Sequence, residues 1–415
     1  MNKLISFVLL FTMLIFVSSV SRAEESPSLN NQLQGDMKWA LSKYHLAGMS
    51  LSYAIGQPSN TITLVQGYAN IQAKMPVKPS TYFQVGSITK AFISSILMRQ
   101  VEVGKITLDE KLKNVAIKYP GKNNELLNIV NKYPYLGEIT IRQFLNHTSG
   151  IPESINTQKF MNAFNRNPTG YWDARQLIAI AMSYKPYFKP GEKDYYGYTN
   201  TDYIIIGVVI EALTGRSIVD EMQRFLSGLG LDNIYFLSTY SANIPKKVLN
   251  QLAHAYILKS SQLFSLPAFK GVPVVIFPEG QLAKDITFIA LAYSTVGAAS
   301  GGMIATTPDL IKWYWLLFHG KVVGKEYFPE MLKGVRTADI NTKYGLAISI
   351  MQTKKYGVIY SHDGDVFGYD ANLLYIPKLN LTLAVAVNTS TAAVEPVKKG
   401  VVGRILKTFA RNINS

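Results

Sequence analysis

Apolar side chains along this chain are spaced as in strands near both ends and as in helices between them. The predicted strands, all short and rich in apolar residues, are 49–55, 61–65, 344–351, 358–362, 371–376 and 381–387. Helical spacing marks a first helix from about Leu33 to Tyr44, a mainly helical stretch over 108–236 and a closing helix over about 396–413. Strands at both ends predict one sheet built from both termini, rather than two sequential domains.

These elements predict an α/β protein of the α+β type. Terminal helices flank an antiparallel sheet, and a mainly helical subdomain is inserted into it. The sheet region is expected at 24–105 and 296–415 and the helical region at 106–295, within one domain. The apolar, proline-containing stretch 257–288 is assigned to none of these elements; both a wall or lid of a site and an ordinary surface excursion stay open.

The first 23 residues have the pattern of a secretory signal peptide. Lys3 gives a short basic start, 4–17 is mostly apolar, and the small residues Ser21 and Ala23 occupy the two cleavage positions. An uncleaved membrane anchor is the alternative, although the apolar run is short for a bilayer span. We therefore predict a periplasmic or secreted protein that is cleaved near Ala23.

Composition and charge narrow the partners and cofactors. The chain has 415 residues, 48% of them apolar and 17% charged, and no cysteine, which is a globular composition without disulfides. Its 5 histidines show no metal-ligand spacing, so we predict no metal and no other cofactor. The formal net charge of +15 falls by two, to +13, without Lys3 and Arg22. We predict no nucleic-acid partner; an anionic cell-envelope surface or simply a basic solvated surface stays open, as does the oligomeric state.

The most informative motif is Ser87 with Lys90 at the start of a predicted helix. An apolar-periodic run follows over 91–103, and Gly104 is a helix C-terminal signal. Residues i and i+3 of a helix have Cβ atoms about 5 to 6 Å apart, so the amine can reach the hydroxyl. The helix N-terminus favours an alkoxide, and burial lowers the pKa of the lysine from about 10.4 toward that of a general base. The alternative is a helix-capping serine beside a solvated lysine.

A second set of polar residues, Tyr198 and Asn200, lies between a Pro-Gly loop and the predicted helix that includes Tyr203. A tyrosine hydroxyl can relay a proton among serine, lysine and leaving group. An amide can accept from the lysine and donate to a substrate carbonyl. The segment Tyr68-Ala69-Asn70 has the same pattern but precedes the serine, so we interpret it as a chance match, a decoy without a role in the site.

A third set, His362 to Asp365, lies at the end of a predicted strand and before a predicted turn over 366–369. Gly364 would let a substrate backbone lie close against the strand. His362 could polarise the Tyr198 hydroxyl, and the backbone N–H groups of Ser87 and Asp365 could form an oxyanion hole. A structural histidine at the end of a strand is the alternative to a catalytic one.

In this order, the three motifs resemble those of the serine β-lactamase and penicillin-binding protein superfamily. The match is closest to the branch of class C β-lactamases and D-alanyl-D-alanine carboxypeptidases, whose middle motif is Tyr-x-Asn. The resemblance implies that Ser87 is the acylated nucleophile, that Lys90 and Tyr198 share the proton transfers, that Asn200 holds the substrate amide, and that His362 lines the third strand. Supporting matches lie at 83–92, 145–152, 198–215, 300–303, 309–310, 344–346 and 362–369.

Two departures from the family pattern bear on the substrate. His362 replaces the lysine of Lys-Thr-Gly, which argues against an efficient β-lactamase. Asp363 and Asp365 stand where relatives that bind a substrate carboxylate often have Thr or Ser, and two acids would repel a carboxylate. The predicted strand 344–351 also lacks the arginine that some carboxypeptidases of this type place there. We therefore expect a free C-terminal carboxylate to bind poorly, with esters, internal amides or amine-bearing substrates as alternatives.

The function that these residues predict is that of an exported serine hydrolase working through an acyl-enzyme. A D-alanyl-D-alanine carboxypeptidase-like peptidase acting on cell-wall peptides is the first expectation. An esterase or a weak β-lactamase of the same family is the first alternative. A penicillin-binding-like module that only recognises its ligand is the second.

Overall fold

The computed structural model describes residues 27–237, 244–390 and 398–412. The predicted signal peptide, residues 1–23, lies outside the described residues, as do the first residues of the predicted closing helix. In the described part of the chain, every helix is too short or insufficiently apolar to cross a membrane.

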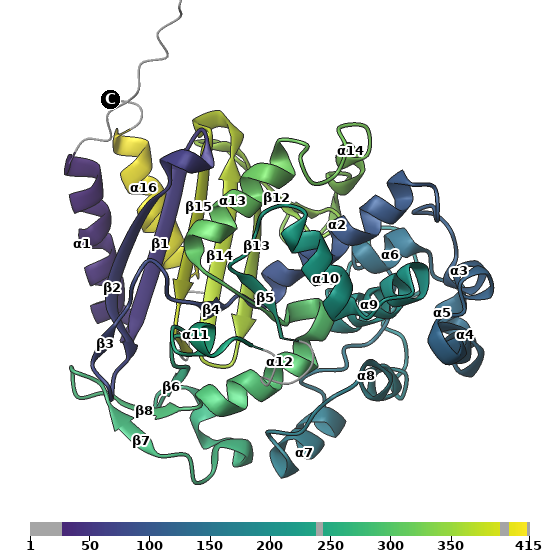
Figure 1. Cartoon of the computed structure of the whole chain (residues 1–415), viewed down its shortest axis with the longest axis horizontal. Coiled ribbons are helices and arrows are strands. Elements are labelled where there is room, and N and C mark those ends of the chain that lie inside the picture. Colours follow the sequence, from purple (N-terminus) through teal and green to yellow (C-terminus); the bar gives the residue numbers. More distant parts are fainter. Residues whose placement is uncertain (1–26, 238–243, 391–397, 413–415) are drawn as a thin grey trace, which may run out of the picture.

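A nine-stranded antiparallel sheet forms the centre of the molecule (Figure 1), with strand order β10-β11-β12-β13-β14-β15-β1-β2-β3. In chain order the strands are β1 (Gly48–Ile55), β2 (Ile62–Asn70), β3 (Met75–Pro76), β10 (Val335–Arg336), β11 (Thr342–Tyr344), β12 (Ser349–Thr353), β13 (Gly357–Val366), β14 (Tyr369–Ile376) and β15 (Leu381–Val387). The N-terminal strand β1 pairs with β15, in a register that runs from Met49 opposite Val387 to Ile55 opposite Leu381. The sheet is therefore built from both ends of the chain, as predicted.

Two small sheets flank the large one. The first, in the order β4-β9-β5, joins β4 (Phe83–Gln84), β9 (Met303–Ala305) and β5 (Ile234–Phe236). The second, in the order β16-β6-β8-β7, joins β16 (Thr389–Ser390), β6 (Tyr256–Leu258), β8 (Leu282–Asp285) and β7 (Val274–Ile276). Half of the stretch 257–288, which the sequence left unassigned, belongs to this second sheet and to two 3₁₀ turns.

Helices cover both faces of the large sheet (Figure 1), which confirms the predicted fold class. The terminal helices α1 (Pro27–Tyr44) and α16 (Gly403–Asn412) lie together on the outer face. Val401, Ile405 and Phe409 are buried there, as expected for the closing helix. The other helices are α2 (Thr89–Glu102), α3 (Leu112–Lys118), α4 (Glu125–Lys132), α5 (Pro134–Gly137), α6 (Ile141–Leu145), α7 (Gln158–Arg166), α8 (Ala174–Ala181), α9 (Asn200–Thr214), α10 (Ile218–Ser227), α11 (Lys246–Leu249), α12 (Thr287–Gly301), α13 (Thr307–Phe318) and α14 (Phe328–Met331).

Two strand predictions need correction. The single strand expected at 344–351 is wrong, because the chain reverses there: Tyr344 at the end of β11 pairs with Ser349 at the start of β12. Gly345 closes the turn by donating its N–H to the Ile348 carbonyl at 2.8 Å. The strand expected to end at His362 continues to Val366, so the whole third motif lies on β13.

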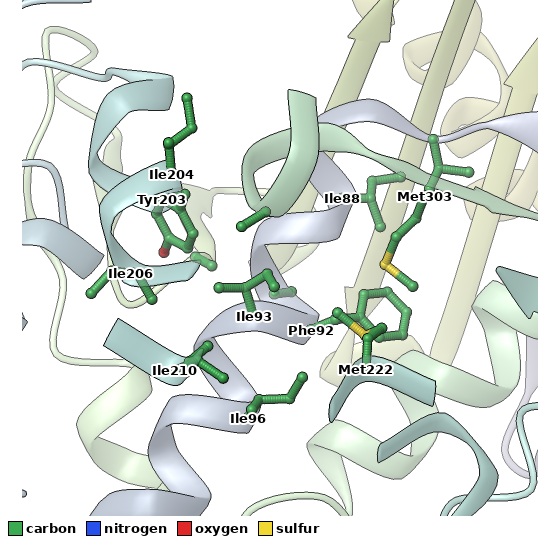
Figure 2. Packing of buried hydrophobic residues seen from close by; sticks show 14 of the residues in the cluster. Ile88, Phe92, Ile93, Ile96, Tyr203, Ile204, Ile206, Ile210, Met222 and Met303 are labelled. Carbon is green, nitrogen blue, oxygen red and sulfur yellow. The ribbon is translucent and has the colours of Figure 1, made fainter. Parts of the chain in front are cut away.

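Helix α2 is buried over its first ten residues, from Thr89 to Met98. Figure 2 shows its side chains Phe92, Ile93 and Ile96 among apolar side chains of α9, α10 and β9. Phe92 also stacks on Trp313 of α13, with ring centroids 3.8 Å apart. Because the first turns of α2 are buried on all sides, the lysine near its start is enclosed as well.

The turn before α2 packs directly against β13. Gly86, Ser87 and Ile88 form a 3₁₀ turn, η2, and α2 begins at Thr89. Gly86 has φ +49°, and a Cβ added to it would lie 2.8 Å from the Asp365 backbone nitrogen. A Cβ at Gly364 would lie 1.9 Å from the Val85 carbonyl oxygen. Both glycines are needed for this backbone contact, which places Ser87 against the third motif.

The contact predicts that Gly364→Ala is destabilising. The added methyl group overlaps a backbone oxygen that cannot move without shifting η2, so we expect the free energy of unfolding to fall by roughly 1–3 kcal/mol. Urea unfolding followed by circular dichroism measures it. Gly35→Ala is the matched control, because a Cβ there meets nothing within 4 Å on helix α1, and it should raise stability slightly. Equal stability of the Gly364→Ala and wild-type proteins would contradict the contact.

Candidate active site

A cleft of about 400 Å³ opens beside η2, β13 and the end of α12. Its walls include residues from all three motifs: Ser87, Tyr198, Asn200, Ser300, Asp363 and Asp365. The structure therefore brings together motifs separated by more than a hundred residues of sequence. Tyr68-Ala69-Asn70, the decoy, lies elsewhere on β2, where the Asn70 side-chain nitrogen is 2.8 Å from His254 Nε2.

Ser87 and Lys90 lie in hydrogen-bond contact, with Lys90 Nζ 2.8 Å from Ser87 Oγ. The lysine side chain is 0% exposed. Burial lowers its pKa to about 7, against the opposing effect of the negative charges of Glu153, Asp363 and Asp202. At neutral pH a substantial share of Lys90 is therefore a neutral amine, as a general base requires.

The other partners of Lys90 direct its lone pair. Nζ donates to Asn200 Oδ1 at 2.8 Å and to the Ser300 carbonyl at 2.7 Å. Both oxygens are acceptors only, so they take the two N–H groups of a neutral amine. The lone pair is then left for the Ser87 hydroxyl, which donates to it.

The Ser300 carbonyl is available because it lies in the last turn of α12, which ends at Gly301. Ala298 has φ +36° and ψ −125°, a conformation that favours glycine and costs an alanine about 1–3 kcal/mol. Backbone strain is thus located at a residue two positions from a contact of the site lysine.

Tyr198 reaches the same serine from the opposite wall. Its hydroxyl is hydrogen-bonded to the Ser87 hydroxyl, and Lys90 Nζ lies 4.9 Å from its ring centroid. One side of the ring is open to the cleft, and the side chain is 38% exposed. Burial of its hydroxyl end raises the pKa of Tyr198 well above its ordinary value, so the hydroxyl stays protonated. Near neutral pH Lys90 can accept a proton, and Tyr198 can donate one.

The loop that carries Tyr198 is fixed by the segment His147 to Gly150. Three backbone hydrogen bonds join them: Tyr187 to Gly150 at 2.9 Å, Gly191 to Thr148 at 2.8 Å and Gly197 to His147 at 3.0 Å. A Cβ at Gly150 would lie 2.1 Å from the Phe188 carbonyl oxygen, which explains the glycine.

A buried polar cluster attaches the same segment to the first turn of α9. Asp202 accepts from Ser149 Oγ at 2.6 Å and contacts His147 Nδ1 at 2.9 Å, and both Asp202 and His147 are fully buried. Burial raises the pKa of Asp202 and lowers that of His147. The His147 ring packs 4.3 Å from the Tyr198 ring, centroid to centroid, and so supports it from behind.

His362 lies behind the cleft wall and is 3% exposed. Its Nε2 is 2.8 Å from the Tyr344 hydroxyl and its Nδ1 is 2.7 Å from the Asp363 carbonyl. The His362 and Tyr198 ring centroids are 6.4 Å apart. The hydroxyl that His362 contacts is thus that of Tyr344, which the sequence had placed within one long strand. A direct action of His362 on Tyr198 stays a prediction.

One edge of β13 faces the cleft beyond the end of β12. Pairing with β12 ends at Ser361 opposite Ser349, whereas pairing with β14 continues to Val366 opposite Tyr369. Asp363 and Asp365 are exposed on this part of the strand and line the cleft. The backbone nitrogens of Ser87 and Asp365 lie where η2 meets β13, as an oxyanion hole would require. The close contact with Val85 explains why residue 364 is a glycine. The role of Gly364 in binding substrate stays a prediction.

Sequence reasoning missed three contributors. Glu153 accepts a hydrogen bond from Asn200. It directly follows the matched segment 145–152, which therefore ended one residue before this contributor. The Ser300 contribution is a backbone carbonyl, for which a sequence carries no side-chain signal. Tyr344 belonged to a matched segment, but only the reversal of the chain after it shows why it meets His362.

Comparison with known proteins agrees with this geometry. Residues 30–404 match the family model described as Beta-lactamase. The chain is 25% identical to the unguisins hydrolase ungD' of Aspergillus campestris and 23% identical to penicillin-binding protein 4* of Bacillus subtilis, over 89% and 74% of this chain. It spans 64% and 61% of those relatives.

A solved structure shares the fold at low sequence identity. The D-amino acid amidase from Ochrobactrum anthropi SV3, complexed with L-phenylalanine amide, is 23% identical and has a TM-score of 0.73, over 94% of this chain and 100% of that chain. The match to the family model covers most of this sequence, and the Ser87, Tyr198 and His362 motifs meet in one region. The chain therefore belongs to the Beta-lactamase family, within the superfamily of serine β-lactamases and penicillin-binding proteins.

Proposed function

We propose that this chain is an exported serine hydrolase that cleaves amide bonds of D-amino-acid-containing peptides through an acyl-enzyme on Ser87. The observation that carries the proposal is the 2.8 Å contact between Ser87 Oγ and a buried Lys90 whose other two acceptors are fixed. Export rests on the signal-peptide pattern of residues 1–23.

Acylation follows from the positions of the three polar groups. Neutral Lys90 takes the Ser87 proton as the serine oxygen attacks the substrate carbonyl, and the Ser87 and Asp365 N–H groups hold the resulting oxyanion. When the tetrahedral intermediate collapses, the C–N bond breaks and Tyr198 gives its proton to the leaving amine. The Lys90 ammonium then restores the phenol.

Deacylation uses the same groups in reverse. A water molecule takes the place of the departed amine, gives its proton to the Lys90 and Tyr198 pair and attacks the ester carbonyl. Collapse of the second oxyanion breaks the bond to Ser87 Oγ, which recovers a proton, and the product leaves as an acid.

The acidic side of the cleft narrows the substrate class. Asp363 and Asp365 line it, and the site's own cation, Lys90, is partly neutral at pH 7. A free carboxylate beside these acids is repelled, so substrates with an uncharged or amine-bearing end fit better. The similarity in fold to a D-amino acid amidase is consistent with an amide substrate. An esterase or a weak β-lactamase is the second candidate, because the same acyl transfer serves an ester or a lactam.

Covalent labelling tests the acyl-enzyme. We expect a penicillin and a fluorophosphonate each to add one adduct mass to the wild-type protein and none to Ser87→Ala, with intact-mass spectrometry as the measurement. Labelling by the fluorophosphonate alone favours the esterase. Absence of any Ser87-dependent adduct would overturn the hydrolase and favour a recognition module without catalysis.

The pH dependence tests the base. Because Lys90 must be neutral to accept the proton, the labelling rate should rise with pH through an apparent pKa of about 7 and level off above it. The rate of fluorophosphonate labelling is measured across neutral pH. The range in which the rate rises with pH is the acid limb of the profile. A rate that is already at its plateau well below neutral pH would contradict Lys90 as the base.

Substrate charge tests the role of the two acids. We expect a D-Ala-D-Ala peptide and its C-terminal amide to be turned over at comparable rates, measured by chromatography of the released product. The Asp363→Asn/Asp365→Asn variant should improve kcat/KM for the free acid by about fivefold or more, while the amide changes less. A strong wild-type preference for the free acid would contradict the repulsion.

A further inference from the structure

Glu153 is surrounded by backbone and side-chain N–H groups just outside the cleft. Its Oε1 accepts from the backbone nitrogens of Ser154 at 2.8 Å and Ile155 at 3.0 Å. Its Oε2 accepts from the backbone nitrogen and from Nδ2 of Asn200, both at 3.0 Å. All four donors hold one carboxylate in place at the first residue of α9.

The carboxylate determines which way the Asn200 amide faces. An ionised carboxylate can only accept, so Asn200 must turn its Nδ2 toward Glu153. Its Oδ1 then faces Lys90, where it accepts from Nζ at 2.8 Å. In the reverse orientation Oδ1 would meet an acceptor, and Nδ2 would meet the lysine amine.

We propose that Glu153 is a positioning residue that fixes the Asn200 amide with its oxygen on Lys90, and thereby keeps the lysine lone pair on Ser87. The role rests on the proposed serine hydrolase. With Oδ1 and the Ser300 carbonyl occupying both N–H groups of the neutral amine, the lone pair has one direction left. A reversed Asn200 would offer Nδ2 as a donor and compete with the serine hydroxyl for that lone pair.

The charge of Glu153 also acts on Lys90. Glu153 is the strongest of the three acids that raise the pKa of Lys90 against burial, ahead of Asp363 and Asp202. The other groups around the lysine are the rings of Tyr198 and Tyr203, the imidazole of His147, whose pKa is lowered by burial, and the imidazole of His362, which contacts the Tyr344 hydroxyl. Loss of the Glu153 charge therefore lowers the pKa of Lys90 further.

Two simpler roles compete with positioning. An anion at the N-terminus of α9 stabilises that helix without any effect on Lys90. A carboxylate near the cleft could also bind an amine of the substrate. Glu153 is not among the residues that line the cleft, and two of its four hydrogen bonds go to Asn200. Both points favour positioning, and an experiment separates the three roles.

The test compares Glu153→Gln with matched variants by fluorophosphonate labelling of Ser87 across a range of pH, read by intact mass. Glutamine has one acceptor oxygen, so it cannot serve both pairs of N–H groups. We expect its maximal labelling rate to fall by about tenfold or more, and the acid limb to move below the wild-type position near pH 7. Glu153→Asp keeps the charge but is shorter, so its rate should fall while its limb stays near that of the wild type.

Asp220→Asn is the control for a helix anion. Asp220 is exposed in the first turn of α10, and its backbone N–H bonds to the capping Ser217. This control makes the same acid-to-amide change at a helix N-terminus, so it should leave both the rate and the limb unchanged. Thermal unfolding of each variant shows which proteins are folded. If Glu153→Gln does not fold, the labelling rate of Glu153→Asp tests the proposal.

The outcomes are distinct. Ser87-dependent labelling with unchanged rate and limb in both Glu153 variants would overturn the positioning role alone. A lower unfolding temperature of Glu153→Gln, with an unchanged labelling rate and limb, would favour the helix-anion role and overturn positioning. A change confined to KM for an amine-bearing peptide would make Glu153 a substrate contact. Equal labelling of wild type and Ser87→Ala would overturn the proposed function and the positioning role together.

Discussion

Lys90 is an amine enclosed in a buried helix, and its three hydrogen-bond partners come from three separate parts of the chain. The drop in its pKa to about 7 corresponds to roughly 5 kcal/mol in favour of the neutral form. That preference exists only while α2 stays covered, because burial is what lowers the pKa of Lys90. The apolar core and the polar site are therefore one constraint, because the packing that stabilises the fold also sets the chemistry of the base.

The chain meets this constraint with polar groups that sit behind the cleft rather than in it. The cluster of His147, Ser149 and Asp202 fixes the first turn of α9 and supports the Tyr198 ring. Glu153 orders the Asn200 amide from the other side. The Asp202 and Glu153 carboxylates and the Ser149 hydroxyl all have hydrogen-bond partners, which lowers the desolvation cost of a polar site inside an apolar core. Among the described residues, His147 Nε2 is buried without such a partner.

Site residues were predicted in two ways: Ser87 and Lys90 from their local spacing, and Tyr198, Asn200 and His362 from motifs that resemble those of a known family. Ser87 and Lys90 are three residues apart in one helical segment, so local geometry was sufficient. The pairing of β1 with β15 followed from strands at both ends. Tyr344 was misplaced because an apolar run broken by Gly345 looks like one strand until the chain reverses. Ser300 lies in the matched segment 300–303, but its role could not be predicted, because it acts through a backbone carbonyl in the last turn of α12.

Net charge and local charge act on a ligand at different ranges. The chain carries +15 overall, yet Asp363 and Asp365 line the cleft and Glu153 lies behind it. At physiological ionic strength a charge is screened over about 8 Å, so basic side chains farther away on the surface do not neutralise the acids of the cleft. Two of these acids, Glu153 and Asp363, also raise the pKa of Lys90 against the effect of burial. An acidic cleft is thus coupled to the base itself, and replacing these acids to admit a carboxylate would also shift the pH at which the lysine is neutral.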